Sequence, residues 1–243
     1  MNDFKLDEVR REIAPSGTLI CALNHGNVVL VRRGPTDDTP TGVSVDLARA
    51  LAEELSLPVR FRHFDKAGDV SGTAGTGEWD VCFLAIDPKR AERIAYSAPY
   101  VQIEGAFLVP RSKSVTTFAD IDRAGLRIGA VKGSAYELFL SRNHVAGTLV
   151  RFDTFPEAAA ALDVGEIDGL AGVRQAMQKA VADRSDFEVM DEPFMAIPQA
   201  VGVSSDRVLA AKYVADLVRK LKSSGFVRRS LDGSGHQDVV VPA

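Results

Sequence analysis

The sequence predicts an α/β protein in which mostly parallel sheets are flanked by helices. Short apolar runs of strand length, such as residues 81–86 and 127–131, recur along the chain. Between them lie segments that keep one apolar face at helical spacing. Strands and helices that alternate in this way form sheets covered by helices. The 243 residues are enough for one large domain or two small ones.

Composition and charge exclude several classes of protein. The chain is 46% hydrophobic and 26% charged, which is typical of a globular protein. Its formal net charge is −4, so it offers no basic field to attract nucleic acid. No apolar run approaches the roughly 20 residues of a membrane-spanning helix. We therefore expect a monomer with no nucleic-acid partner and no direct membrane insertion.

Cysteine and histidine usage indicates neither a metal site nor a cofactor. Cys21 and Cys82 lie in apparent strands, where two small core residues are expected rather than a disulfide. His63, His144 and His236 are scattered, without the spacing of metal ligands. The chain also lacks the G-x-S-x-G motif of a nucleophile elbow. We expect no catalytic residues, metal or cofactor.

The first residues, M-N-D-F-K-L-D-E-V-R-R-E-I, are charged throughout and lack the apolar core of a signal peptide. The sequence as written therefore predicts a cytoplasmic protein. The alternative is a periplasmic protein whose export signal has been removed.

Polar residues follow the first predicted strand, residues 18–23. Asn24, His25 and Asn27 lie in the N-H-G-N segment at the carboxyl end of this strand. Ligands of open α/β sheets bind at the carboxyl ends of strands. His25 is therefore a candidate ligand contact, with an ordinary loop histidine as the alternative. Ser44 is expected to cap the next helix, over residues 44–55.

Residues 80–100 hold the strongest candidate binding residue. The buried strand at residues 81–86 stops at Asp87-Pro88, which reads as a helix N-cap and first helical position. Arg90 then falls in the first turn of this helix, near the carboxyl end of the strand. A guanidinium there can hold a carboxylate through two hydrogen bonds. The alternative is a solvated Arg90 paired with Asp87 or Glu92.

A second module is expected from Ser112 onward. Ser134 and Glu137 have capping-box spacing just after the strand at residues 127–131, so a helix should begin there. The first amides of such a helix form an anion site, although the segment can equally be a capped helix without a ligand. Further strands are expected at residues 59–64, 101–109, 149–152, 167–173, 187–190 and 199–204. Further helices are expected at 174–182 and 206–223, and an Ala-rich helix is expected after Thr154 and Glu157, which repeat the capping-box spacing.

Three motifs together resemble the family 3 solute-binding proteins of ABC transporters, the amino-acid-binding group with the type II periplasmic binding fold. G-V-S-V-D-L-A-R-A-L-A-E-E-L is similar to the first helix of that family. W-D-V-C-F-L-A-I-D-P-K-R-A-E-R-I-A-Y-S-A-P-Y resembles its D-(hydrophobic run)-T-P-E-R-x-x-x-I-x-F-S-x-P-Y segment, and R-I-G-A-V-K-G-S-A-Y-E its V-G-V-Q-x-G-T/S-T-x-E turn. The resemblance covers about residues 17–228.

The resemblance implies two lobes that close on a ligand held between them. Lobe 1 would comprise residues 1–102 and 199–243, and lobe 2 residues 111–193. Residues 103–110 and 194–202 would be hinge-crossing strands. By position, Arg90 matches the carboxylate-binding arginine of the family, and Ser134 with the amide of Ala135 matches the groups that complete the grip.

Other positions depart from the family pattern. Phe83, Leu84 and Ala85 replace the small hydroxylic residues that touch the amino group of the ligand. Asn27 and Ala67 replace two aromatic residues. Val173, with Arg174 beside it, replaces the acid that fixes the α-ammonium. Burying an ammonium without a counter-charge costs several kcal/mol, so a carboxylate without an amine is the expected ligand. Arg174 would either bind a second acidic group of the ligand or point outward from the first turn of its helix.

The leading functional hypothesis is therefore non-enzymatic binding of a small carboxylate, either for an ABC permease or for sensing. The alternative is an enzyme on the same fold, similar to cyclohexadienyl or arogenate dehydratases, with Glu104 as its acid. A third is the effector-binding half of a regulator, which the negative charge and the lack of a DNA-binding motif before Gly17 disfavour.

Overall fold

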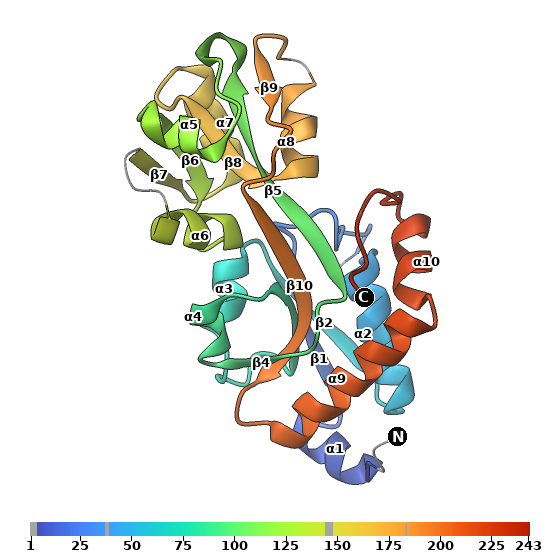
Figure 1. The fold of residues 1–243 in the computed structure, drawn as a ribbon. Coiled ribbons are helices and arrows are strands. Elements are labelled where there is room, and N and C mark those ends of the chain that lie inside the picture. Colours follow the sequence, from blue (N-terminus) through green and yellow to red (C-terminus); the bar gives the residue numbers. More distant parts are fainter. Residues whose placement is uncertain (1–3, 37–38, 144–147, 183) are drawn as a thin grey trace. The chain divides into compact units, whose positions relative to one another are not determined.

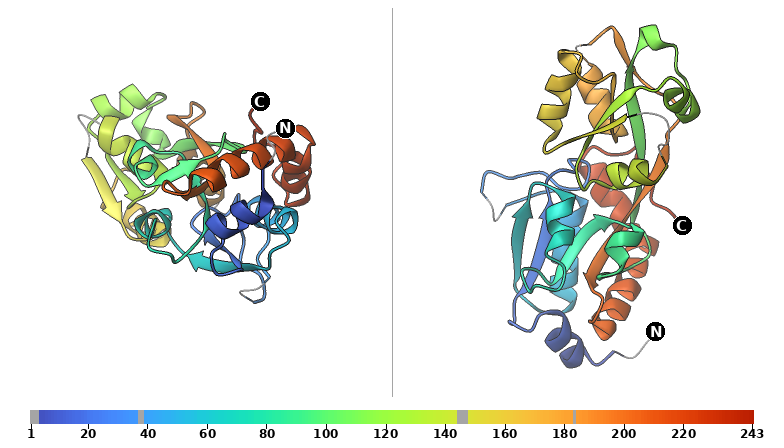
Figure 2. Two further views of the ribbon diagram at one scale, coloured as in Figure 1. Left: turned by 90° about the horizontal axis from the view of Figure 1, so that it is seen from below. Right: turned by 90° about the vertical axis from the view of Figure 1, so that its left-hand side faces the viewer.

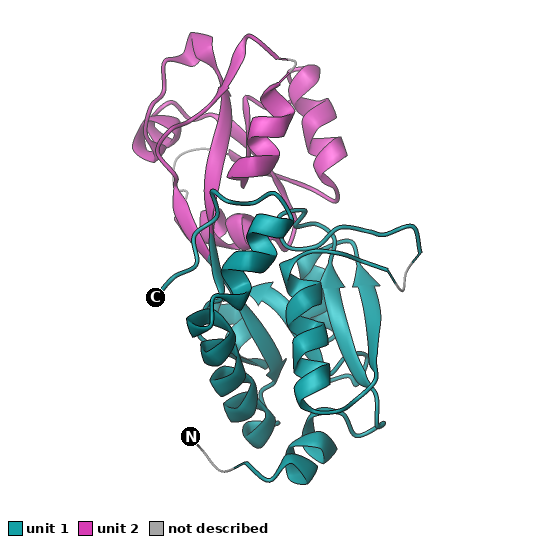
Figure 3. Ribbon diagram, turned by 90° about the vertical axis from the view of Figure 1, so that its right-hand side faces the viewer, with its two compact units in different colours: residues 1–102, 198–243 teal, residues 103–197 magenta. Residues whose placement is uncertain are grey.

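Strands and helices alternate through most of the chain, as the sequence predicts (Figure 1). The computed structural model describes residues 4–36, 39–143, 148–182 and 184–243. These fall into two compact units (Figure 3). Unit 1 comprises Met1–Gln102 and Pro198–Ala243, and unit 2 comprises Ile103–Ile197. His144 lies outside the described residues.

The sheet of unit 1 has the strand order β2-β1-β3-β10, with β4 paired to β10. β1 is parallel to β2 and β3, whereas β10 runs antiparallel to β3 and β4. The strands are β1 (Leu19–Asn24), β2 (Val59–Phe64), β3 (Val81–Ala85), β4 (Ile94–Tyr96) and β10 (Met195–Ser204). The helices are α1 (Leu6–Ile13), α2 (Val43–Glu54), α3 (Ala67–Gly72), α4 (Pro88–Ala91), α9 (Val208–Ser223) and α10 (Phe226–Gly233).

The sheet of unit 2 has the order β5-β8-β6-β7, with β9 paired to β5. β6 is parallel to β7 and β8, and β5 is antiparallel to β8 and β9. The strands are β5 (Val101–Pro110), β6 (Arg127–Val131), β7 (Thr148–Phe152), β8 (Gly169–Val173) and β9 (Phe187–Val189). The helices are α5 (Phe118–Arg123), α6 (Ala135–Asn143), α7 (Phe155–Asp163) and α8 (Arg174–Val181), and a short 3-10 turn covers Arg111–Lys113.

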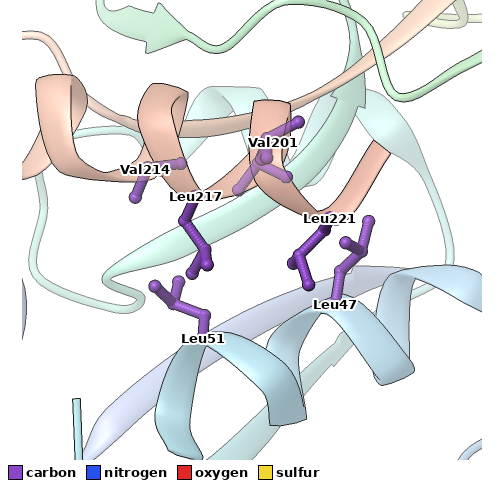
Figure 4. Close-up of a pocket in the computed structure, with 7 residues that line it drawn as sticks. Leu47, Leu51, Val201, Val214, Leu217 and Leu221 are labelled. Carbon is purple, nitrogen blue, oxygen red and sulfur yellow. The ribbon is translucent and has the colours of Figure 1, made fainter. Parts of the chain in front are cut away.

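Helices cover both faces of the unit 1 sheet (Figure 2). On one face, Leu47 and Leu51 of α2 lie opposite Leu217 and Leu221 of α9, with Val201 of β10 beneath them (Figure 4). On the other face, α3 packs against the sheet through a cluster of buried residues: Ala22, Val70, Ala74, Trp79, Cys82, Leu84 and Ile94. The α3 cluster thus buries Cys82 and Leu84, close to the end of β3.

The sheet of unit 2 is also packed on two sides. Phe107 and Ile128 belong to a core cluster with Ile121 of α5 and Leu140 of α6. Ala106 and Leu170 belong to a second cluster with Leu162 of α7. The two cysteines, Cys21 and Cys82, are free thiols in the core, as predicted, and burial raises the pKa of Cys82 to about 12.

The start of α2 differs from the prediction. Gly42, not Ser44, is the N-cap residue, and its backbone has φ 114° and ψ 169°, which only glycine adopts readily. Ser44 lies inside the first turn, and its hydroxyl exchanges a hydrogen bond of 3.1 Å with the Tyr100 hydroxyl. The prediction of a Ser44 cap was therefore wrong, because this side chain has a distant partner that the local sequence does not reveal.

Two further boundaries differ. β10 begins at Met195, four residues before the strand expected at 199–204 but inside the hinge-crossing strand expected at 194–202, and the chain adds α10, which the sequence analysis did not predict. β5 and β10 contain the residues at which the chain passes from one unit to the other. Their role as hinges stays a prediction. No helix within the described residues combines the length and hydropathy that crossing a bilayer requires.

Candidate functional site

Arg90 lies directly after the end of a buried strand. β3 stops at Ala85, and the Asp87 side chain accepts a hydrogen bond of 2.9 Å from the Lys89 backbone N–H, with Pro88 at the first helical position. This confirms the predicted cap. Arg90 is only 4% exposed, and its Nη1 donates to the Ala85 carbonyl at 3.1 Å. The alternative was wrong in placing Arg90 in solvent, although Asp87, one of the partners it named, lies close enough to act on the charge of Arg90.

Arg90 is a buried positive charge with one carboxylate, Asp87, near it. Burial lowers the pKa of Arg90, while the nearby Tyr96 and Asp87 act in the opposite direction. Arginine nevertheless keeps its charge in proteins. A buried positive charge is stabilised by an anion that replaces part of its lost hydration. The arrangement thus has the charge and the position expected of a carboxylate-binding group.

Phe83, Leu84 and Ala85 lead up to Arg90 as parts of the core. Leu84 is 1% exposed and belongs to the cluster against α3, and Phe83 packs edge-on against Tyr100 with ring centroids 6.4 Å apart. Ala85 contributes its carbonyl oxygen to Arg90. The Phe83 and Leu84 side chains therefore stabilise unit 1, and we leave them out of the site we propose.

Two histidines meet at the same end of the unit 1 sheet. His25 Nε2 and His63 Nδ1 are 2.7 Å apart. His25 follows β1, and His63 is the penultimate residue of β2. The backbone N–H of His25 donates to the Phe64 carbonyl at 2.8 Å. The sequence indicated His25 but missed His63, whose position at the end of a strand parallel to β1 was the available sign.

Asparagines hold the loop that carries His25. Asn24 Oδ1 accepts from the Gly26 backbone N–H at 3.1 Å. Asn27 is 7% exposed, and its Oδ1 is buried without a hydrogen-bond partner among the described residues. Ala67, which the resemblance places where the family has an aromatic residue, is the first residue of α3. Asn24 therefore shapes the loop, whereas Asn27 brings a buried acceptor to it.

In unit 2, Ser134 caps α6. Ser134 Oγ accepts from the Glu137 backbone N–H at 3.1 Å, and Glu137 Oε2 accepts from the Gly133 N–H at 3.1 Å. The predicted capping pair is confirmed. The first N–H groups of any helix, here beginning at Ala135, have no acceptor within the helix. They therefore point toward a position where an anion is stabilised.

Glu137 is the buried acid at this helix start. Burial opposes its ionisation, but hydrogen bonds from Ser141, Arg151 and Gly133 outweigh burial and hold the pKa of Glu137 below its ordinary value. Arg151 Nε donates to Glu137 Oε1 at 2.7 Å. Glu137 is therefore ionised and fully engaged in shaping the turn.

Arg174 follows Val173, at the end of β8, and is held within unit 2. Its Nε donates to Glu104 Oε2 at 2.5 Å, and its Nη1 and Nη2 donate to the carbonyls of Met190 and Asp191 at 3.1 and 2.9 Å. Val173 is the N-cap of α8 and offers no side-chain hydrogen bond there. This geometry favours a structural role for Arg174 over the binding of a second acidic group of a ligand.

Metal binding receives no support from the described part of the chain, where no three His, Cys, Asp or Glu side chains come together as a possible ion site. The groups that the sequence-predicted site offers are instead the buried guanidinium of Arg90, the contact between His25 and His63, and the capped start of α6.

Comparison with known proteins adds relatives to this geometry. The model of the bacterial extracellular solute-binding proteins, family 3, matches residues 31–230. The ABC transporter arginine-binding protein 1 of Escherichia coli (strain K12) is 25% identical over 176 residues, which are 71% of this chain and 64% of that protein. The match thus spans slightly less than two thirds of the relative.

Solved structures share the fold. The cysteine-binding protein from Campylobacter jejuni superposes with a TM-score of 0.79 at 19% identity, covering 98% of this chain and 99% of that one. The ancestral amino acid-binding protein AncCDT-1, described as a precursor of cyclohexadienyl dehydratase, gives 0.74 at 20% identity, with coverage of 95% and 99%. At such identities the likeness concerns the fold alone.

Proposed function

The chain belongs to family 3 of the bacterial extracellular solute-binding proteins, and from this premise we propose that it binds a small carboxylate through Arg90 without catalysing a reaction. The observation that carries the proposal is the burial of a guanidinium, 4% exposed, at the carboxyl end of β3. A guanidinium binds a carboxylate through two parallel, charge-assisted hydrogen bonds.

Unit 2 contributes the capped start of α6 to the proposal. Ser134 Oγ accepts from the Glu137 N–H, and its hydroxyl also forms a hydrogen bond with the Tyr136 side chain. A carboxylate oxygen beside the Ala135 amide would take the place of Tyr136 as the acceptor of this hydroxyl. The resemblance implies that both units hold one ligand, and this clamp stays a prediction.

The expected ligand lacks a conventional α-ammonium group. Val173 stands where the resemblance places an acid, and the carboxylate of the nearby Glu104 already accepts a hydrogen bond from Arg174. An ammonium group at this point would lose its hydration and gain little negative charge in exchange, so burying it would cost free energy. Carboxylates without an amine are therefore proposed over ordinary amino acids.

Delivery to an ABC-type permease is the proposed biological use, with sensing as its variant. The matched family is one of extracellular proteins, and the arginine-binding relative is an ABC transporter component. We therefore propose a periplasmic or extracellular location, because the expected cytoplasmic location finds no support in the family.

A thermal-shift screen with calorimetry tests this function. The screen covers amino acids, monocarboxylates, dicarboxylates, keto acids and aromatic acids. We expect a carboxylate to raise the melting temperature, because it binds the folded state. Arg90→Met should lower the affinity for that ligand by at least about thirtyfold, since a desolvated charge pair contributes about 2 kcal/mol or more.

The matched control is Lys89→Met, which removes an exposed charge from the same turn. It should leave the affinity within about threefold, since exposed charges contribute little. Unchanged affinity in Arg90→Met would disprove the assignment of Arg90, and an amino acid bound more tightly than its deaminated analogue would disprove the ligand class.

A dehydratase-like enzyme is the competing function, because AncCDT-1 shares the fold. Its proposed acid, Glu104, accepts a hydrogen bond from Arg174. A carboxylate used as an acceptor in this way is poorly arranged to donate a proton. Turnover of prephenate or arogenate by the purified protein, lost in Glu104→Gln, would replace the binding function with this one.

A further inference from the structure

Tyr96 lies beside Cys82 on the face of the unit 1 sheet that α3 covers. Gly202 of β10 is in register with Cys82 on one side and with Tyr96 on the other. Directly opposed residues of antiparallel strands point to the same face, and both side chains pack in the cluster against α3. A Cβ added at Gly202 would lie 3.0 Å from the Cys82 sulfur and 3.2 Å from Cε1 of Tyr96. The missing side chain of Gly202 therefore leaves room for the Tyr96 ring next to the Cys82 thiol.

The Arg90 guanidinium lies near the same two side chains. Its Nη1 donates to the carbonyl of Ala85, three residues after Cys82 on β3. Burial raises the pKa of Tyr96 and of Cys82, and the positive charge of Arg90 opposes the rise in both groups. Apart from burial, Tyr96 has the largest effect on the pKa of Arg90, ahead of Asp87. The Tyr96 side chain is therefore a close polar neighbour of the guanidinium.

The Tyr96 hydroxyl is a buried group that the protein itself does not use. Its oxygen is shielded from solvent and has no hydrogen-bond partner among the described residues. Packing of the ring does not require the hydroxyl, because the family motif I-x-F-S-x-P-Y has phenylalanine where this chain has Tyr96. Nearly all buried polar groups of native proteins have a partner. A partner for this hydroxyl is therefore expected from outside the chain.

An anion held at Arg90 needs a further donor of this kind. A carboxylate has about four lone-pair sites, and a guanidinium fills two of them. Arg90 is only 4% exposed, so an anion that reaches it loses most of its hydration and depends on protein donors instead. Asp87 accepts from the Lys89 N–H and cannot donate while ionised. Because its pKa is raised, Tyr96 keeps its proton and can donate it.

We propose that Tyr96 is a further ligand-binding residue, whose hydroxyl donates a hydrogen bond to the anionic group that Arg90 holds. This inference rests on the proposed function and deepens it by naming a second donor of the same site. A hydrogen bond from a neutral hydroxyl to an anion is stronger than one between neutral groups. The Tyr96 hydroxyl thus costs stability in the free protein and is compensated when the anion binds.

The test separates binding from folding in Tyr96→Phe. Butanoate, glutarate, 2-oxoglutarate, benzoate and phenylpyruvate are each titrated by calorimetry into the full chain as wild type, Tyr96→Phe and Arg90→Met. A probe that binds the wild type should lose at least about tenfold in affinity in Tyr96→Phe, because a hydrogen bond to a charged group is lost. Without a probe, the urea midpoint of Tyr96→Phe should equal or exceed that of the wild type, because phenylalanine packs the same ring without burying a hydroxyl.

Tyr213→Phe is the matched control. Tyr213 is a buried tyrosine of α9 whose ring packs edge-on against Phe4, with centroids 5.3 Å apart. It belongs to no part of the proposed site. Its substitution removes the same hydroxyl group and should leave the affinity for the bound probe within about twofold.

The outcomes separate this inference from the proposed function. A probe that loses affinity in Arg90→Met but binds Tyr96→Phe as tightly as the wild type would overturn the role of Tyr96 alone. A lower urea midpoint in Tyr96→Phe, whatever its affinity, would show that the hydroxyl has a structural partner and would also overturn that role. Failure of every probe to bind the wild type would count against both proposals.

Discussion

Arg174 Nε donates to Glu104 Oε2 at 2.5 Å, and the pair ties the start of α8 to β5. The other two nitrogens of Arg174 donate to the carbonyls of Met190 and Asp191, in the segment that follows β9. One side chain thus connects three segments of unit 2. This distribution of contacts distinguishes a bracing arginine from one placed to receive a ligand.

The first prediction concerns this brace. Arg174→Met should lower the free energy of unfolding by about 2–3 kcal/mol, because it removes three hydrogen bonds from a charged donor. Glu104→Gln should cost less than about 1 kcal/mol, since the Glu104 side chain is 47% exposed and an amide oxygen can still accept. Urea denaturation measures both. Equal losses in the two variants would show that the ion pair, and not the carbonyl contacts, holds the segments.

The second prediction compares two of the capped helices of unit 2, α6 and α7. Ser134→Ala and Thr154→Ala each remove a side chain that accepts from a backbone N–H three residues later, so each should cost about 1 kcal/mol of stability. Only Ser134→Ala should also weaken the binding of the carboxylate found in the thermal-shift screen. Equal ligand affinities in the two variants would remove Ser134 from the proposed site.

Much of the architecture could be predicted from the sequence. The apolar strand that ends at Asp87-Pro88 and the Ser134–Glu137 spacing are local features, and both are confirmed. The family resemblance carried by three motifs is likewise confirmed by the matching family model. These features depend on residues within a few positions of one another, where hydrophobic period and capping chemistry act directly.

The features that the sequence did not reveal depend on distant partners. Ser44 has the side chain of an N-cap, yet its hydroxyl bonds to Tyr100, 56 positions away. Arg174 looked like a ligand group at a strand end until its contact with Glu104, 70 positions away, was visible. His63 became interesting only through its contact with His25. Pairings of this kind depend on strand register, which local patterns do not fix.

The third prediction follows from the true cap of α2. Gly42 has φ 114°, and a Cβ there would lie 2.5 Å from the Leu30 carbonyl oxygen. Gly42→Ala should therefore cost about 3 kcal/mol or more, from backbone strain and from a clash with backbone that has little room to move. Urea denaturation measures the loss. Gly72→Ala is the control: nothing lies within 4 Å of its added Cβ, so it should be neutral or stabilising by up to about 1 kcal/mol.

The fourth prediction is a pH dependence from His236. Arg32 Nη2 lies 3.1 Å from His236 Nε2, and a guanidinium can only donate, so this imidazole nitrogen must be unprotonated. Burial and then Arg32 lower the pKa of His236 below its ordinary 6.5. The unfolded chain therefore binds this proton more readily than the folded chain, and the stability from this group is present above about pH 6.5 and lost as the pH falls through the folded value. His236→Gln keeps an acceptor for Arg32 but does not titrate, so its free energy of unfolding should fall less than that of wild type between pH 7 and pH 5. Parallel pH profiles for the two proteins would show that His236 takes up its proton as readily in the folded chain as in the unfolded chain, which would contradict the prediction.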